Sequence, residues 1–113
     1  MGVIEALGRL RADVNRAALD GRTPAHAAAG KGHVAAVEAL GRLGADVNIA
    51  DKHGATPIIS AAMDGHVAVI EALARLGADL NAEDDNEWTP LAIARDEGHS
   101  AAAEVLERLG ARR

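Results

Sequence analysis

The sequence predicts an all-α solenoid made of turn–helix–loop–helix units of 33 residues. Three observations support this prediction. Short motifs recur at a fixed step of 33 residues, Thr-Pro and glycine divide the chain into short helical segments, and a composition that is 49% hydrophobic includes a single aromatic residue, Trp88. A core of Ala, Leu, Val and Ile suits closely packed short helices. We expect one domain over residues 1–113.

Five columns of identical residues share the 33-residue register. A fixed period of this length is the sequence signature of a repeat array. The columns are Thr23-Pro24, Thr56-Pro57 and Thr89-Pro90; Gly32-His33, Gly65-His66 and Gly98-His99; Glu5, Glu38, Glu71 and Glu104; Leu7, Leu40, Leu73 and Leu106; and Asn15, Asn48 and Asn81.

Each unit begins with a turn that leads into a first helix. Asp, Asn and Gly favour turns, as in residues 51–54. Thr56 can cap free N–H groups and Pro57 fits the first helical position, so we expect a helix from Pro57 to Met63. Gly65 ends this helix.

A second helix follows from about His66 to Leu76, with Val69, Ile70 and Leu73 on one side. Gly77 permits the left-handed backbone that closes its C-terminus. Neither helix is long enough to be stable alone, so the apolar faces must be buried by stacking against neighbouring units.

The segments 51–57, Ala61-Ala62, Gly65-His66 and 77–81 (Asp-Lys-His-Gly-Ala-Thr-Pro, and Gly-Ala-Asp-Leu-Asn) resemble the ankyrin repeat. The resemblance covers essentially the whole chain. It implies three successive repeats at residues 18–50, 51–83 and 84–113. Residues 3–17 resemble the second helix and following turn of a repeat whose first half is absent.

Several positions depart from this pattern. Ala18 stands where Asp51 and Asp84 begin the turn, and Glu87 stands in a glycine column. Because positive φ is disfavoured for a residue other than glycine, we expect the turn at Glu87 to be strained or rearranged. Arg11 stands in the glycine column that ends the second helices, so it weakens the C-terminal end of the first of them. Arg95 replaces an alanine, which indicates that this face of the last repeat is exposed.

The large apolar residues near the ends of the second helices stand two positions later than in the usual ankyrin pattern. Ankyrin repeats usually carry Leu where this chain has Gly8, Gly41, Ala74 and Glu107, and leucine appears instead at Leu10, Leu43, Leu76 and Leu109. We expect these leucines to be at least partly buried by repacking over the small residues. The rival interpretation is an exposed apolar stripe that binds another molecule.

Charge and composition limit the class of function. The formal net charge of −5 disfavours nucleic-acid binding, and the absence of cysteine excludes disulfides and thiolate metal sites. Residues 1–10 do not resemble a signal peptide, and no apolar run approaches the roughly 20 residues that span a bilayer. We therefore expect no membrane association and an intracellular, cytoplasmic protein.

The C-terminal half is the acidic end of the chain. Residues 51–83 contain five acidic and two basic side chains, and residues 84–113 contain seven and four. This distribution favours a basic or polar partner surface, or it serves solubility alone.

The candidate chemical sites favour structural roles. Neighbouring stacked helices lie about 8–10 Å apart. The His33, His66 and His99 column therefore cannot share one ion, because Zn–N bonds are about 2 Å long. His26 resembles the histidine that braces the ankyrin turn, and His53 is expected to be solvated. Because Ser60, Ser100 and Gly30-Lys31-Gly32 match no nucleophile or phosphate-loop motif, we expect no enzyme, no metal and no cofactor.

The resemblance implies a non-catalytic module that binds a protein through its turn tips and the concave face of its first helices. The residues at these positions differ from repeat to repeat, while the framework columns stay fixed. The predicted partner-binding residues are Leu19, Asp20, Arg22, Lys52, His53, Ala55, Met63, Asp64, Asp85, Asn86, Trp88, Asp96 and Glu97.

Two alternatives stay open at this point. The chain starts in mid-repeat after Met1-Gly2, which is typical of an engineered or excised scaffold with no natural partner, although the irregular positions argue against a fully idealised design. Self-association is the other alternative. It would occur through the truncated N-terminal end if Val3, Ile4 and the alanines of the first helix, Ala25, Ala28 and Ala29, lose their expected cover.

Overall fold

The computed structural model describes residues 14–112, and over this range it contains α-helices and no strand. The helices are α2 (Pro24–Gly30), α3 (Val34–Arg42), α4 (Pro57–Asp64), α5 (Val67–Arg75), α6 (Pro90–Asp96) and α7 (Ser100–Arg108). The predicted all-α solenoid is therefore confirmed.

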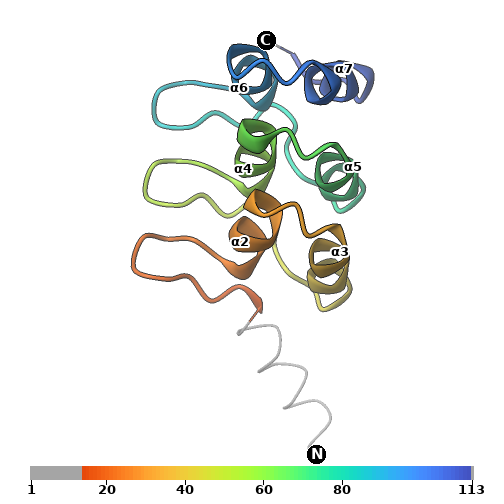
Figure 1. Cartoon of the computed structure of the whole chain (residues 1–113). Helices are drawn as coiled ribbons and strands as arrows, with labels where there is room; N and C mark the ends of the chain where they lie inside the picture. Colours follow the sequence, from red (N-terminus) through yellow and green to blue (C-terminus); the bar gives the residue numbers. More distant parts are fainter. Residues whose placement is uncertain (1–13, 113) are drawn as a thin grey trace, which may run out of the picture.

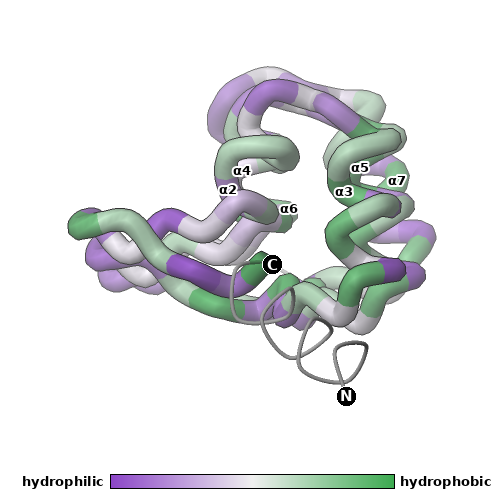
Figure 2. The backbone as a smooth tube through the Cα atoms, turned by 90° about the horizontal axis from the view of Figure 1, so that it is seen from below, coloured by the Kyte–Doolittle hydropathy of each residue, from purple (hydrophilic) through white to green (hydrophobic). Residues whose placement is uncertain are grey.

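Helices of the same kind stack on one another (Figure 1). The first helices α2, α4 and α6 form one column, the second helices α3, α5 and α7 form another, and the loops before the first helices project from the opposite side. Seen along the stack, the loops, first helices and second helices lie side by side in that order (Figure 2). Each unit is thus one flat layer of the stack. A binding partner would contact the edges of these layers.

Two of the three first helices begin as the Thr-Pro columns predict, whereas the expectation that Thr56 caps α4 was wrong, because its side chain accepts no backbone N–H group. Thr23 and Thr89 accept backbone N–H groups of the first turn at 3.4 and 3.2 Å, and each is followed by proline at the first helical position. Large apolar side chains fill the space between layers. Ile58, Ile70 and Leu73 are fully buried.

Alanines at the centre of the first helices allow the two helix columns to approach closely. Ala25, Ala28 and Ala29 are 1%, 8% and 0% exposed, because α2 packs against both α3 and α4. The expectation that these three alanines lose their cover was wrong. Val3 and Ile4, the other part of that argument, lie outside the described residues.

Two histidines of the repeated column link α5 and α7 to the unit before each of them. His66 Nε2 lies 3.1 Å from Gly30 O, and His99 Nε2 lies 3.0 Å from Met63 O. Both rings therefore hold a free carbonyl at the end of a first helix, and the structural interpretation is confirmed for them. Between residues 14 and 112, no three His, Asp or Glu side chains gather closely enough to hold a metal ion.

The displaced leucines are about three-fifths covered. Leu43, Leu76 and Leu109 are 41%, 37% and 38% exposed. Gly41 has no side chain, and a Cβ there would collide with the end of Leu76, so Leu76 lies over Gly41 of the preceding unit. Partial burial by repacking is thus confirmed for Leu76, while Leu10 lies outside the described residues.

The last unit presents a charged outer face. The Arg95 side chain is 53% exposed and its guanidinium lies 2.9 Å from a carboxylate oxygen of Glu107, which confirms the exposure predicted for this position. No helix between residues 14 and 112 has the length and apolarity needed to cross a lipid bilayer.

Candidate protein-binding surface

The loops before the first helices are closed by one repeated set of hydrogen bonds. In the loop 51–55, Asp51 Oδ1 accepts the backbone N–H groups of His53 and Ala55 at 2.9 and 3.0 Å. Asp84 forms the equivalent pair of bonds one unit later, at 2.8 and 3.0 Å. These carboxylates fix the backbone, so the side chains at the tip point outward from a rigid turn.

The first loop keeps this shape without the aspartate. Ala18 N donates to Arg22 O at 2.9 Å, as in the other loops. Asp20 Oδ1 accepts the backbone N–H of Arg22 at 3.0 Å and supplies one of the side-chain bonds that Ala18 cannot make. The departure at Ala18 therefore changes the support of the loop but preserves its closure.

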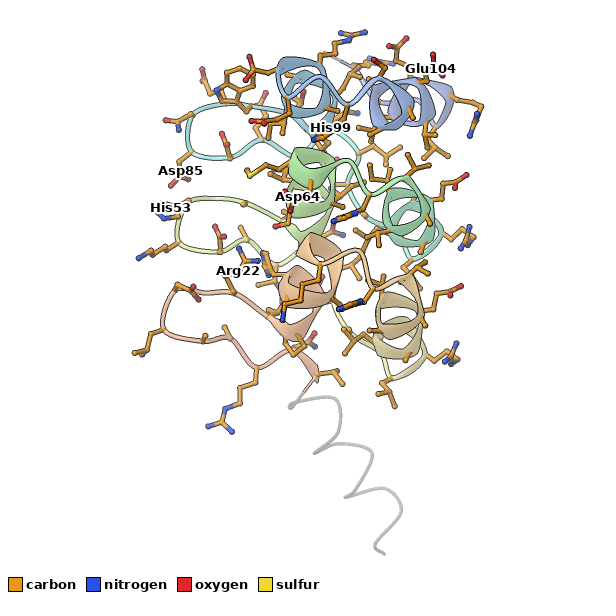
Figure 3. All side chains as sticks on the ribbon, viewed as in Figure 1. Arg22, His53, Asp64, Asp85, His99 and Glu104 are labelled. Carbon is orange, nitrogen blue, oxygen red and sulfur yellow. The ribbon has the colours of Figure 1, made fainter. Side chains whose placement is uncertain are left out.

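Consecutive loops are joined to each other at their tips. Lys52 N donates to Asp20 O at 2.9 Å, and Asp85 N donates to His53 O at 3.0 Å. The tips therefore form one continuous edge, with His53 and Asp85 at its outer margin in Figure 3. A partner lying along this edge would meet three units at once.

The irregular turn at Glu87 is strained rather than rearranged. Glu87 has φ 66°, close to the 80° of Gly54 at the same position one unit earlier. A Cβ at Gly54 would lie 2.7 Å from Asp85 N of the next loop, so a side chain is excluded there. The loop that contains Glu87 is the last of the described column, and its outer side is open (Figure 1).

The residues predicted to bind a partner all lie on the loops or at the C-terminal ends of the first helices, and none is buried. The exposed members are Leu19, Lys52, His53, Met63, Asp64, Asp85, Asn86, Trp88, Asp96 and Glu97, and the half-buried ones are Asp20, Arg22 and Ala55.

Two adjoining cavities lie between the loops and the first helices. The Arg22 cavity, of about 350 Å³, is lined by Arg22, Gly30, Asp51, His53, Ala55, Ile59, Ser60, Met63, Asp64 and Asp84. The Trp88 cavity, of about 200 Å³, is lined by Met63, Asp84, Asn86, Trp88, Ile93, Asp96 and Glu97. Because Met63 and Asp84 line both, the cavities form one groove along the inner side of α4 and α6.

The two cavities differ in charge. In the first, Arg22 lies 3.8 Å from Asp51 and also donates to His26 O at 3.5 Å. In the second, every ionisable lining residue is acidic. Among the described residues, Asp64, Asp96 and Glu97 have no ion-pair partner. The groove therefore becomes more negative towards α6.

The family model for ankyrin repeats in three copies matches residues 2–84 and 43–112. The chain belongs to the ankyrin repeat family. Ankyrin repeats are generally protein–protein interaction modules and are typically non-catalytic. No curated protein matches this chain.

One histidine of this ankyrin framework braces the loop of the next repeat. The buried His26 ring accepts the backbone N–H of Thr23 through Nδ1 at 3.0 Å, so the hydrogen on Nε2 can be donated to Ala55 O at 2.7 Å. The predicted bracing role of His26 is thereby confirmed. Ile59 occupies this position in α4, and Thr56 Oγ1 is left buried without a hydrogen-bond partner.

Sequence reasoning missed two features of the ankyrin groove. Ile59 and Ile93 form the base of the groove while remaining buried in the core, and a helical pattern assigns them to the core alone. The sequence predicts Asp51 and Asp84 only as turn residues, yet both also line the groove. The feature they share in the sequence is that each begins a turn that leads into a first helix.

Proposed function

We propose that this chain is a non-catalytic module that binds a protein partner through its loop tips and the groove along α4 and α6. One observation carries the proposal. The loop and first-helix positions that differ from unit to unit are exposed or half-buried on one side of the stack, whereas the fixed Thr positions, Leu73 and Leu106 are buried.

The loop side and the opposite helical side differ in the surfaces they offer. The loop side carries Trp88 and Met63, which are 37% and 47% exposed, beside unpaired carboxylates. On the second helices, Glu38 and Glu71 are already engaged with Arg75 and Arg108 at 3.6 and 3.7 Å. Interfaces are enriched in aromatic residues and methionine, which favours the loop side as the binding surface.

A capture experiment tests this proposal. The wild-type protein is immobilised and exposed to a lysate of the cells that contain it, beside the variant Lys52→Ala, Asp85→Ala. The matched control is Arg42→Ala, Glu104→Ala, which removes the same charges from the second helices; Glu104 lies on α7, away from the loops (Figure 3). We expect the control to capture the same protein as wild type and the tip variant to lose it.

The alternatives predict other results. An engineered or excised scaffold without a natural partner would capture nothing specifically. Self-association would give a concentration-dependent mass in sedimentation without any lysate. An intracellular, cytoplasmic location is part of the proposal, and fractionation of the source cells tests it. Equal capture by both variants would place the interface away from the loop tips.

A further inference from the structure

The Trp88 cavity combines an apolar floor with an acidic rim. Met63 of α4 and the indole of Trp88, which are 47% and 37% exposed, supply most of the apolar surface, and Ile93 of α6, which is 6% exposed, lies beneath them. Asp84, Asp96 and Glu97 supply three carboxylates, and no basic side chain lines the cavity. A ligand side chain that fills this space must be apolar along its length and positively charged at its end.

Trp88 is held in place by its loop. Its backbone N–H donates to Asp84 Oδ1 at 3.0 Å, and its carbonyl accepts the backbone N–H of Asp84 at 3.1 Å. The side chain remains 37% exposed, so part of the indole is open to a partner. A cation over an indole face is attracted by the negative face of the ring, and Trp gives the strongest such attraction of the aromatic side chains.

Three carboxylates lie at the C-terminal ends of the first helices, where a negative charge does not stabilise the helix. Asp96 is the last residue of α6 and Glu97 is its C-cap, while Asp64 is the last residue of α4. Carbonyl groups at a helix C-terminus carry partial negative charge and favour basic residues there. None of the three has an ion-pair partner among residues 14–112. Their attraction is therefore available to a cation from outside.

We propose that the Trp88 cavity receives one arginine side chain from an extended segment of the protein partner; this inference rests on the proposed function. The planar guanidinium stacks on the indole and presents up to five N–H donors to the carboxylates of Asp84, Asp96 and Glu97. The methylene groups of the arginine lie against the exposed side chain of Met63.

The neighbouring Arg22 cavity is less negative than the Trp88 cavity. Arg22 lies beside Asp51 at 3.8 Å, whereas Asp64 in the same cavity has no ion-pair partner among the described residues, so that cavity carries charges of both signs. The arginine of the partner segment is therefore expected in the Trp88 cavity, whose ionisable lining residues are all acidic. A phosphate backbone is excluded from the same groove by repulsion from its carboxylates.

The single tryptophan makes the inference measurable. Indole emission can only come from Trp88, so it reports on this cavity alone. The probe is the pentapeptide Ala-Gly-Arg-Gly-Ala, whose ends are acetylated and amidated so that the arginine carries its only charge. It is titrated into the full chain at low salt. We expect a saturable change in emission with a dissociation constant of about 1 mM or lower. Replacing arginine by its uncharged analogue citrulline should weaken binding at least tenfold, and replacing it by lysine several-fold.

The variant Asp96→Asn, Glu97→Gln tests the carboxylates. It should weaken arginine-peptide binding at least tenfold and leave the melting temperature unchanged or raised. The matched control Glu38→Gln, Glu104→Gln makes the same change in net charge on the second helices and should bind as wild type. Binding that survives in the first variant, or that falls equally in both, would overturn the proposal.

Further results separate this inference from the proposed function. No change in emission up to about 10 mM peptide, or equal binding of the citrulline peptide, would overturn an arginine site. Equal binding of the lysine peptide would overturn the assignment to arginine. If the loop-dependent capture of a protein persists in these cases, the proposed function stands without the arginine. If capture is also absent, both fail.

Discussion

The side-chain oxygen of Asn48 accepts the backbone N–H of Asp79 at 2.7 Å, 31 residues later in the chain. The Nδ2 amino group of the same side chain donates a hydrogen bond to Gly77 O at 3.1 Å. Asn15 and Asn81 hold the backbone of the next unit in the same way, at 2.7 and 2.8 Å. The asparagine column therefore ties each unit to the next below the second helices.

Replacing Asn48 by alanine removes both bonds and should lower the free energy of unfolding by about 1 kcal/mol, since a hydrogen bond in a protein contributes about 0.5–1.5 kcal/mol. Chemical denaturation measures this. Asn86→Ala, at a loop tip, is the control and should stay within about 0.5 kcal/mol of wild type. An equal effect of both substitutions would contradict a linking role for Asn48.

Glu87→Gly should stabilise the protein by about 1 kcal/mol, because it relieves a positive φ that costs a side-chain-bearing residue about 1–2 kcal/mol. The melting temperature should rise. Gly54→Glu is the reverse change at the same position one unit earlier. It should destabilise by more than that, since its Cβ would also meet the backbone of Asp85. A Glu87→Gly variant that melts earlier than wild type would show that Glu87 makes a stabilising contact.

The two threonine caps should respond differently to loss of their hydroxyl. Thr23→Val removes a group that lies 3.0 Å from His26 Nδ1 and caps α2, and it should cost about 1–2 kcal/mol. Thr56→Val removes a buried oxygen that has no partner, so it should be neutral or stabilising. Equilibrium denaturation distinguishes the two. A similar loss in both variants would mean that Thr56 is paired in solution.

Leu76→Ser should lower stability by about 1–2 kcal/mol, because the leucine buries about three-fifths of its surface over Gly41 and full burial is worth about 1.5–3 kcal/mol. Thermal unfolding and partner capture should be measured together. Stability that holds while capture is lost would make the leucine column an interface instead.

The repeating framework could be predicted from the sequence because each repeated column has a local cause. Thr-Pro begins a helix, glycine ends it, and the 33-residue step sets the stack. The groove could not be predicted in the same way. Met63 and Trp88 are 25 positions apart and line one cavity only because α4 and α6 stack at a particular distance. The support for the first loop by Asp20 likewise depends on atomic positions, which no residue pattern encodes.

The binding contribution of Trp88 tests the central claim most directly. Trp88→Ala is compared with wild type for affinity to the captured partner, and the melting temperatures of both proteins are recorded. We predict that affinity falls about 30-fold or more, as for a residue that contributes about 2 kcal/mol at the centre of an interface, with little change in melting. Unchanged affinity, or a loss explained by early melting, would contradict a binding surface centred on the loops and the first helices.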